Sequence, residues 1–221
     1  MTSESLPAQT TAPAPVTVDV WADIVCPFCY IGEARLRKAA DPAVVIHPRA
    51  FQLNPDGGER ESVMSYLARK FGSTEEQVRE SQQRIVDLAR AEGLPFTNDR
   101  VVGDTMNSHR LVLAALGEGG PALALDVREA IQRGHFGGTL DITDADALVD
   151  TAVKVGLDVD LARAAIDNDD LAQLVRAEHQ QASQMGATGV PFTVVGERFG
   201  IPGMVETDQY AEVIARVREA H

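Results

Sequence analysis

Cys26 and Cys29 are the only cysteines in this 221-residue chain, and they stand in a Cys-Pro-Phe-Cys run. Two thiols at this spacing on a helix lie one turn apart on the same face, where a disulfide can join them. Pro27 suits the first position of a helix, because the N–H that proline lacks would have no partner there. The free N–H groups at a helix start favour thiolate over thiol. We therefore expect Cys26 to be the attacking thiol and Cys29 to resolve the mixed disulfide.

Two other interpretations of the pair stay open at this point. Two small buried hydrophobic side chains would carry no chemistry at all. A zinc site would need two further ligands, and the five histidines are scattered along the chain without a paired spacing. We expect neither a metal nor a bound cofactor.

The flanking sequence predicts the elements that hold the pair. An alternating, β-branched run at 16–21 indicates a strand, 30–40 a helix and 44–51 a second strand. The cysteine pair therefore lies at a strand-to-helix junction of a β-α-β unit, which strengthens a redox interpretation. The pattern at 189–201 predicts a hairpin turning at Gly196-Glu197, and Thr207 is expected to cap a last helix.

Between these two parts, from about residue 54 to 184, the pattern is helical. The expected helix boundaries are a capping box of Ser73 with Glu76, an end at Gly117, a new start at Pro121, a cap at Thr143 with Asp146 closing at Gly156, and a start at Asn168 for a helix reaching Met185. Arg128 falls on what we interpret as a solvated helix face. The sum is a small α/β domain into which a helical domain is inserted.

Composition limits the possible partners. The net charge of −13 argues against nucleic acid, which selects basic surfaces, and against anionic membranes. The first 15 residues have no basic or apolar segment typical of a secretory signal, and no later segment is apolar for long enough to span a bilayer. We expect a disordered tail at 1–15 and a cytoplasmic protein, in which a close cysteine pair is more often catalytic than structural.

Several stretches resemble the DsbA-like thioredoxin superfamily, and most closely its FrnE-type branch. They are Asp23-Ile-Val-Cys-Pro-Phe-Cys-Tyr-Ile-Gly32, Phe51-Gln-Leu-Asn-Pro55, Asn107-Ser-His-Arg-Leu111, Asp141-Ile142 and Gly189-Val-Pro-Phe192. The resemblance covers nearly everything after the tail, in the right order. It implies an α/β, thioredoxin-like domain made of 16–54 and 187–221, with a large all-α domain inserted at 55–186.

The resemblance also implies roles for single residues. Pro191 would be cis, face the cysteines and join them as a catalytic residue, while the Val190 backbone would pair with an extended substrate. Pro27, Phe28, Asn54 and His109 would contact substrate, and Asp23 would transfer a proton. An exposed or capping carboxylate at Asp23 and a structural histidine at 109 remain alternatives, and Trp21 is expected in the core.

Two departures from the family pattern limit this transfer. Strongly oxidising members resemble Cys-Pro-His-Cys, whereas Phe28 can give the thiolate neither a hydrogen bond nor a positive charge. Pro-Phe is more similar to the Pro-Tyr of glutaredoxins, which suggests a potential nearer to roughly −200 mV than to −120 mV. The second cysteine pair of some FrnE-type proteins is absent.

Three functions stay under consideration. The first is thiol–disulfide exchange with a protein or small-molecule thiol, by a monomer or homodimer. The second is a glutathione-dependent isomerase or transferase of the same superfamily, including a polyketide-pathway isomerase, with glutathione as co-substrate. Those relatives typically carry serine at the position of Cys26, so the intact pair argues against them. The third is a peptide-binding or chaperone module without catalysis.

Overall fold

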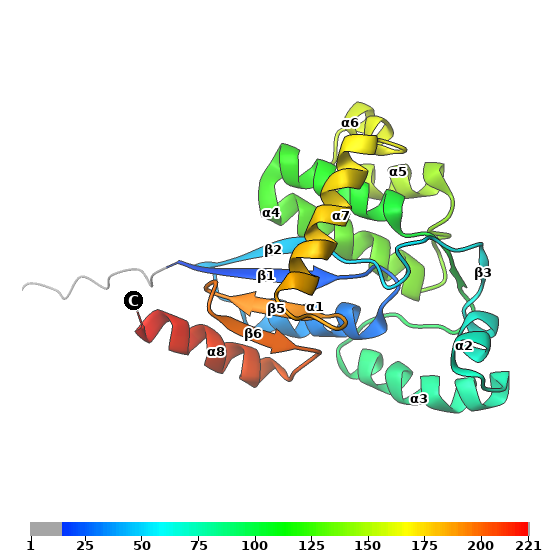
Figure 1. Cartoon of the computed structure of the whole chain (residues 1–221), viewed down its shortest axis with the longest axis horizontal. Helices are drawn as coiled ribbons and strands as arrows, with labels where there is room; N and C mark the ends of the chain where they lie inside the picture. Colours follow the sequence, from blue (N-terminus) through cyan, green and yellow to red (C-terminus); the bar gives the residue numbers. More distant parts are fainter. Residues whose placement is uncertain (1–14, 221) are drawn as a thin grey trace, which may run out of the picture.

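A four-stranded mixed sheet forms the centre of the molecule in the computed structural model, which describes residues 15–220 (Figure 1). Its strand order is β2-β1-β5-β6. β1 (Val16–Ala22) runs parallel to β2 (Val44–Ala50), while β5 (Phe192–Val195) is antiparallel to β1 and to β6 (Phe199–Pro202). The tail expected at 1–15 lies, apart from residue 15, outside the described residues.

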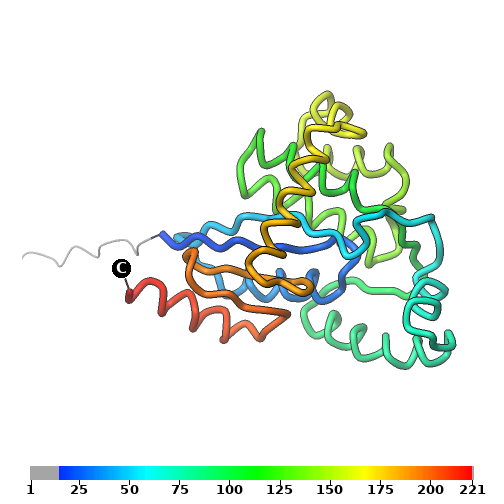
Figure 2. Tube along the Cα trace, viewed as in Figure 1, coloured from blue at the N-terminus to red at the C-terminus, as the bar shows by residue number. Residues whose placement is uncertain are grey.

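Helices cover both faces of this sheet. On one face α1 (Pro27–Ala39) packs beside α8 (Thr207–Glu219), and their apolar residues share a core with β1 and β5. On the other face lie α4 (Met106–Phe136) and α7 (Asp169–Gln184), both in contact with β2 (Figure 1). β1 starts at the same end of the sheet where α8 ends (Figure 2). The chain leaves the other end of β1 and reaches Cys26 four residues later, immediately before α1.

The segment between β2 and β5 contains α2 (Val63–Phe71), α3 (Glu75–Ala91), α4, α5 (Ala145–Lys154), α6 (Val159–Ala165) and α7. It is not purely helical, because β3 (Glu61–Ser62) and β4 (Val101–Val102) pair as a short antiparallel ladder that the sequence analysis did not predict. The segment also shares its packing with the sheet, since Leu125 of α4 belongs to the sheet's hydrophobic cluster. The division into a discontinuous domain of 16–54 and 187–221 and an inserted domain of 55–186 stays a prediction.

Helix boundaries follow the expected pattern with shifts of one to three residues. Asn168 caps α7 as predicted, through a hydrogen bond from Leu171 N. The other caps are Thr74 rather than Ser73, Asp144 rather than Thr143, and Glu206 rather than Thr207. Thr74 prevails because it forms a reciprocal capping box with Gln77.

The helix expected to end at Gly117 continues for three more residues. The chain breaks helical geometry at Gly120, whose φ of 68° suits glycine, and Pro121 then opens the second half of α4 as predicted. Among residues 15–220, no helix has the length and hydropathy needed to cross a bilayer.

Candidate active site

Cys26 is the residue that immediately precedes α1, and Cys29 lies in the first turn of that helix. Cys26 has extended backbone angles, and its carbonyl accepts hydrogen bonds from Cys29 N at 3.1 Å and Tyr30 N at 3.2 Å. Pro27 occupies the first helical position, as the sequence predicts. The pair is therefore held at a helix N-terminus, where N–H groups without helical partners surround the first sulfur.

The loop before β5 completes the site from the far end of the sequence. The Val190–Pro191 peptide bond is cis, which confirms that prediction. Cys26 Sγ lies 3.6 Å from the Val190 carbonyl oxygen and donates a hydrogen bond to it. Pro191 packs close to α1, since a Cβ atom placed on Gly32 would lie in ordinary van der Waals contact with Pro191 Cγ, at 3.5 Å. Pairing of β5 with β1 thus brings residues 190 and 191 against the cysteine helix.

The two thiols differ in their surroundings. Cys26 borders a pocket, whereas Cys29 lies beneath it with 1% of its surface exposed. Burial raises the pKa of Cys29 well above its ordinary value, and the hydrogen bond and negative charge of Cys26 raise it further. Cys29 is consequently a protonated thiol at neutral pH, while Cys26, itself only 4% exposed, is the cysteine that borders the pocket.

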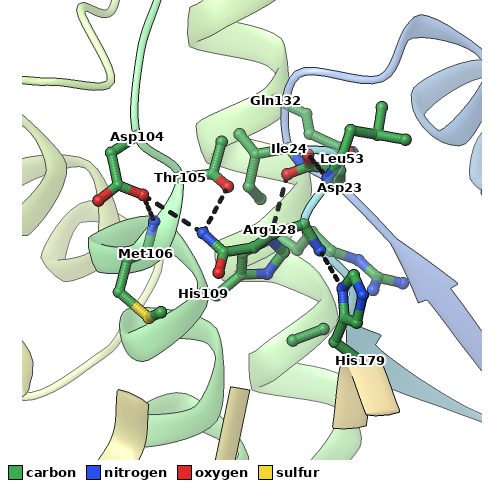
Figure 3. A network of polar contacts seen from close by, with 12 residues as sticks. Asp23, Ile24, Leu53, Asp104, Thr105, Met106, His109, Arg128, Gln132 and His179 are labelled. Atoms are coloured by element: carbon green, nitrogen blue, oxygen red, sulfur yellow. Dashed lines mark hydrogen bonds and ion pairs between the residues drawn. The ribbon is translucent and has the colours of Figure 1, made fainter. Parts of the chain in front are cut away.

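Asp23 and His109, proposed separately from sequence, contact each other (Figure 3). Asp23 Oδ1 accepts from Ile24 N at 2.8 Å and lies 3.2 Å from His109 Nε2, while Oδ2 accepts from Leu53 N at 2.8 Å. Both side chains are 1% exposed. The alternative of an exposed carboxylate at Asp23 is therefore wrong, since the side chain is buried and each oxygen accepts a hydrogen bond from the backbone.

His109 is placed differently from the other expected substrate contacts. It lies behind Asp23 and does not border the pocket, so the geometry gives it no direct contact with a substrate. Its bond to Asp23 fits the interpretation of a structural histidine that positions a carboxylate near the cysteines.

Gln52, which the sequence analysis did not single out, fixes the loop that follows β2. Its backbone N–H donates to His179 Nδ1 at 3.3 Å, and its side-chain amide donates to Asp104 and Thr105, each at 3.3 Å (Figure 3). These bonds tie the Phe51–Pro55 stretch to the start of α4. The adjoining Leu53 N–H is thereby held where it meets Asp23.

A pocket of about 720 Å³ opens beside Cys26. Four residues expected to contact substrate border it, namely Pro27, Phe28, Asn54 and Val190. The structure thus brings these four residues together at one cavity beside Cys26. Helices α2 and α3 and the strands β3 and β4 supply most of the opposite wall.

Arg128 is a correction to the sequence analysis, which placed it on a solvated face. It is 1% exposed, forms an ion pair with the buried Glu33 of α1, and donates to the carbonyls of Val20 and Arg49 at 3.2 and 3.3 Å. α4 crosses the sheet at this point, so an arginine on its inner face meets strand carbonyls and a counter-charge instead of water. Trp21 is in the core, as predicted.

Other polar residues near the site escaped sequence reasoning. Gln132 Nε2 donates to the Asp23 carbonyl at 3.5 Å, and Gln82, Lys70 and Arg100 border the pocket. None belongs to a motif or a regular spacing that marks a site. In the part of the chain that the structure describes, no three His, Cys, Asp or Glu side chains are grouped as metal ligands would be.

The family model for the DSBA-like thioredoxin domain matches residues 17–215. The chain belongs to this family. None of the curated proteins compared with it matches. Among solved structures, a probable DsbA oxidoreductase from Streptomyces coelicolor is 32% identical, with a TM-score of 0.85 over 93% of this chain and 91% of the other.

Two more distant structures share the fold of this DsbA-like chain. The cytosolic disulfide reductase DsbM from Pseudomonas aeruginosa, solved with GSH, is 20% identical, with a TM-score of 0.64 over 92% of this chain and 96% of the other. A 2-hydroxychromene-2-carboxylate isomerase is 16% identical, with a TM-score of 0.64 over 92% and 95% of the two chains.

Proposed function

We propose that this DsbA-like protein is a thiol–disulfide oxidoreductase whose redox centre is the Cys26–Cys29 pair. The observation that carries the proposal is the position of Cys26, which stands at the start of α1, borders the pocket and contacts the Val190 carbonyl. Attack on a disulfide needs a sulfur that the substrate can approach, and Cys26 combines a border on the pocket with a place beside the N–H groups of a helix start.

The proposed reaction has two exchange steps. The Cys26 thiolate attacks one sulfur of a substrate disulfide, the substrate S–S bond breaks, and a thiolate leaves. Cys29 then loses its proton and attacks the Cys26 sulfur, which releases the second substrate thiol and leaves a Cys26–Cys29 disulfide. The substrate gains two electrons and the protein loses two, and the reverse sequence oxidises a substrate dithiol.

Asp23 is the proposed acceptor of the Cys29 proton. Burial is the largest cause of the raised pKa of Cys29, and Asp23 acts on the same thiol in two ways: its backbone hydrogen bond lowers that pKa and its negative charge raises it. His109 would position this carboxylate and share the proton through their 3.2 Å contact. Val190 would pair its backbone with an extended substrate beside Cys26, while Pro27, Phe28 and Asn54 line the substrate's path.

A small thiol such as glutathione is the proposed electron donor, in a reducing, cytoplasmic setting. The Pro-Phe dipeptide between the cysteines is more similar to the Pro-Tyr of glutaredoxins than to the Pro-His of strong oxidants. This similarity suggests a reduction potential of roughly −200 mV, within the range of glutaredoxins. Equilibration of the protein with a series of reduced and oxidised glutathione mixtures measures it. A potential near that of the strong oxidants would contradict the assignment.

The exchange mechanism is tested with two matched variants. Cys29→Ala should accumulate a mixed disulfide between Cys26 and its substrate, because the resolving sulfur is gone, while Cys26→Ala should form none. Mass spectrometry of both variants after addition of oxidised glutathione or insulin reports the adduct. Absence of any adduct on Cys29→Ala would refute the proposed function.

The glutathione-dependent isomerase is the second candidate, and the shared fold of an isomerase structure is the observation in its favour. Such an enzyme activates the thiol of glutathione and needs no cysteine of its own. Full isomerase activity in Cys26→Ser, with glutathione bound, would support it over disulfide exchange.

A further inference from the structure

The pocket beside Cys26 has an unusual charge for this chain. Its lining includes four basic residues, Arg60, Arg69, Lys70 and Arg100, and three acidic ones, Asp23, Glu59 and Glu61. The whole chain has 20 basic and 33 acidic residues, so the pocket reverses the overall balance. The lining therefore has a small excess of basic residues in a protein that is acidic as a whole.

Two of these cations have no carboxylate partner. Arg69 pairs with Glu61 and Arg60 with Asp141, but between residues 15 and 220 no carboxylate lies within ion-pair distance of Arg100 or Lys70. Lys70 is exposed on α2, and its ammonium group contacts the Tyr66 hydroxyl at 2.9 Å. These two positive charges remain available to a ligand.

Arg100 is the more informative of the two, because it is only 7% exposed and yet borders the pocket. Its guanidinium lies over the rings of Phe96 and Phe136, at 4.6 and 5.0 Å from their centroids, and donates to the Thr97 carbonyl. Its Nε has no hydrogen-bond partner within the described chain. Burial lowers the pKa of Arg100 to about 10, so the group is still charged at neutral pH.

A buried, charged group without a counter-ion is costly and calls for an explanation. The same wall holds Gln82, which is 7% exposed and whose side-chain oxygen also has no partner among the described residues. Arg100 thus offers a cation and an unpartnered N–H to an anionic ligand, while the Gln82 oxygen could accept only from a donor group of that ligand or from water.

Apart from Asn54, Thr105 and two glycines, the rest of the pocket lining is apolar. Val63, Tyr66, Leu67 and Ile85 line it, and three large hydrophobic side chains at its edge are exposed, namely Phe28 at 42%, Leu53 at 40% and Phe71 at 68%. Exposed hydrophobic residues gathered around a cavity mark a binding site. A volume of about 720 Å³ is in the range of cavities that hold small organic molecules.

We propose that the pocket selects small thiols or disulfides that carry an apolar group about the size of an aromatic ring and a carboxylate or similar anionic group. Arg100 and Lys70 bind the anionic group while the sulfur of the ligand contacts Cys26. The proposal rests on the thiol–disulfide exchange proposed above and names its substrate class. A guanidinium matches a carboxylate in geometry as well as in charge, whereas an ammonium adds attraction without fixed direction.

Two aromatic disulfides of similar size provide the test. 5,5′-Dithiobis(2-nitrobenzoate) carries a carboxylate on each ring, and 4,4′-dithiodipyridine carries none at neutral pH. Each reacts with the reduced protein in the same way: Cys26 takes one aryl-sulfur group, Cys29 displaces it, and two arylthiols and a Cys26–Cys29 disulfide result. The measured quantity is the second-order rate constant for 5,5′-dithiobis(2-nitrobenzoate) divided by that for 4,4′-dithiodipyridine. This ratio is then divided by the same ratio measured with 2-mercaptoethanol in place of the protein.

We expect a normalised ratio above 1 for the native protein. The ratio should fall about tenfold in Arg100→Gln and about threefold in Lys70→Gln. Arg100→Lys keeps the positive charge, so its ratio should lie between those of the native protein and Arg100→Gln. Arg84→Gln and Lys154→Gln remove matching charges from exposed positions outside the pocket and should leave the ratio unchanged. Circular dichroism checks the fold of Arg100→Gln, and Lys70 is exposed enough to be replaced without a packing defect.

The outcomes separate the two proposals. A ratio near 1 that does not change in Arg100→Gln or Lys70→Gln would overturn the anionic subsite while leaving disulfide exchange intact. Failure of native Cys26 to react with either reagent would overturn both. A fall in the ratio that the two control variants reproduce would assign the preference to the overall charge and so refute the subsite.

Discussion

Selective alkylation of the reduced protein is the most direct check on the roles of the two cysteines. Burial and the neighbouring Cys26 hold the pKa of Cys29 well above about 9. A thiol with a pKa of 9 is about 1% ionised at pH 7, and each further unit reduces that share tenfold. Because Cys29 is also only 1% exposed, Cys26 should react with iodoacetamide at least about tenfold faster at pH 7.

The assay measures initial labelling rates by peptide mass spectrometry across a pH series. Cys29 labelling should rise with pH, because its thiolate forms only as the pH approaches its raised pKa. In Cys26→Ala the hydrogen bond and charge from Cys26 are lost, so the midpoint for Cys29 should move to lower pH. It should stay above that of free cysteine, since burial is the largest cause of the shift. Equal initial rates for the two native cysteines would refute the reasoning.

Three further predictions concern the buried polar groups. Asp23→Asn should slow the resolving step by at least about tenfold in stopped-flow exchange, because the proposed proton acceptor is lost; an unchanged rate would reduce Asp23 to a structural role. Glu33→Gln should lower the free energy of unfolding by about 3–5 kcal/mol in urea, because it leaves the charge of Arg128 buried without its partner, and a loss below 1 kcal/mol would contradict that pairing. Burial lowers the pKa of His135 to about 3, so the folded protein keeps the ring neutral while the unfolded chain binds a proton below about pH 6.5. The unfolding free energy should therefore fall by about 3 kcal/mol between pH 7 and pH 4. In His135→Phe this dependence on pH should be weaker, because the titrating ring is gone.

The parts of the fold that local chemistry determines were predictable from sequence. The start of α1 at Pro27 and the cap at Asn168 depend on residues within a few positions of each other. Where two good caps stood side by side, as at residues 73 and 74, sequence could not rank them, because the choice depends on how the helix enters from the preceding turn. The cis bond at Pro191 followed from family resemblance and not from the residues alone.

The parts of the site that depend on packing between elements distant in sequence were not predictable. Arg128 is a surface residue by its local pattern, and only the passage of α4 over the sheet turns it toward Glu33. Arg100 and Gln82 come from a loop and a helix more than fifty residues after Cys26. No spacing rule connects them with the cysteines, since their meeting point is a cavity that forms only in three dimensions.

The contact between Cys26 and Val190 spans 164 positions of the chain, which has a consequence for biosynthesis. The Cys26 sulfur leaves the ribosome 164 residues before the carbonyl that faces it. Until residue 190 and the strand that follows it have been made, the nascent polypeptide carries two thiols without the second half of their site. The chemistry of the centre therefore begins only after β5 has joined the sheet, and a contact of this sequence separation carries a high loop-closure cost.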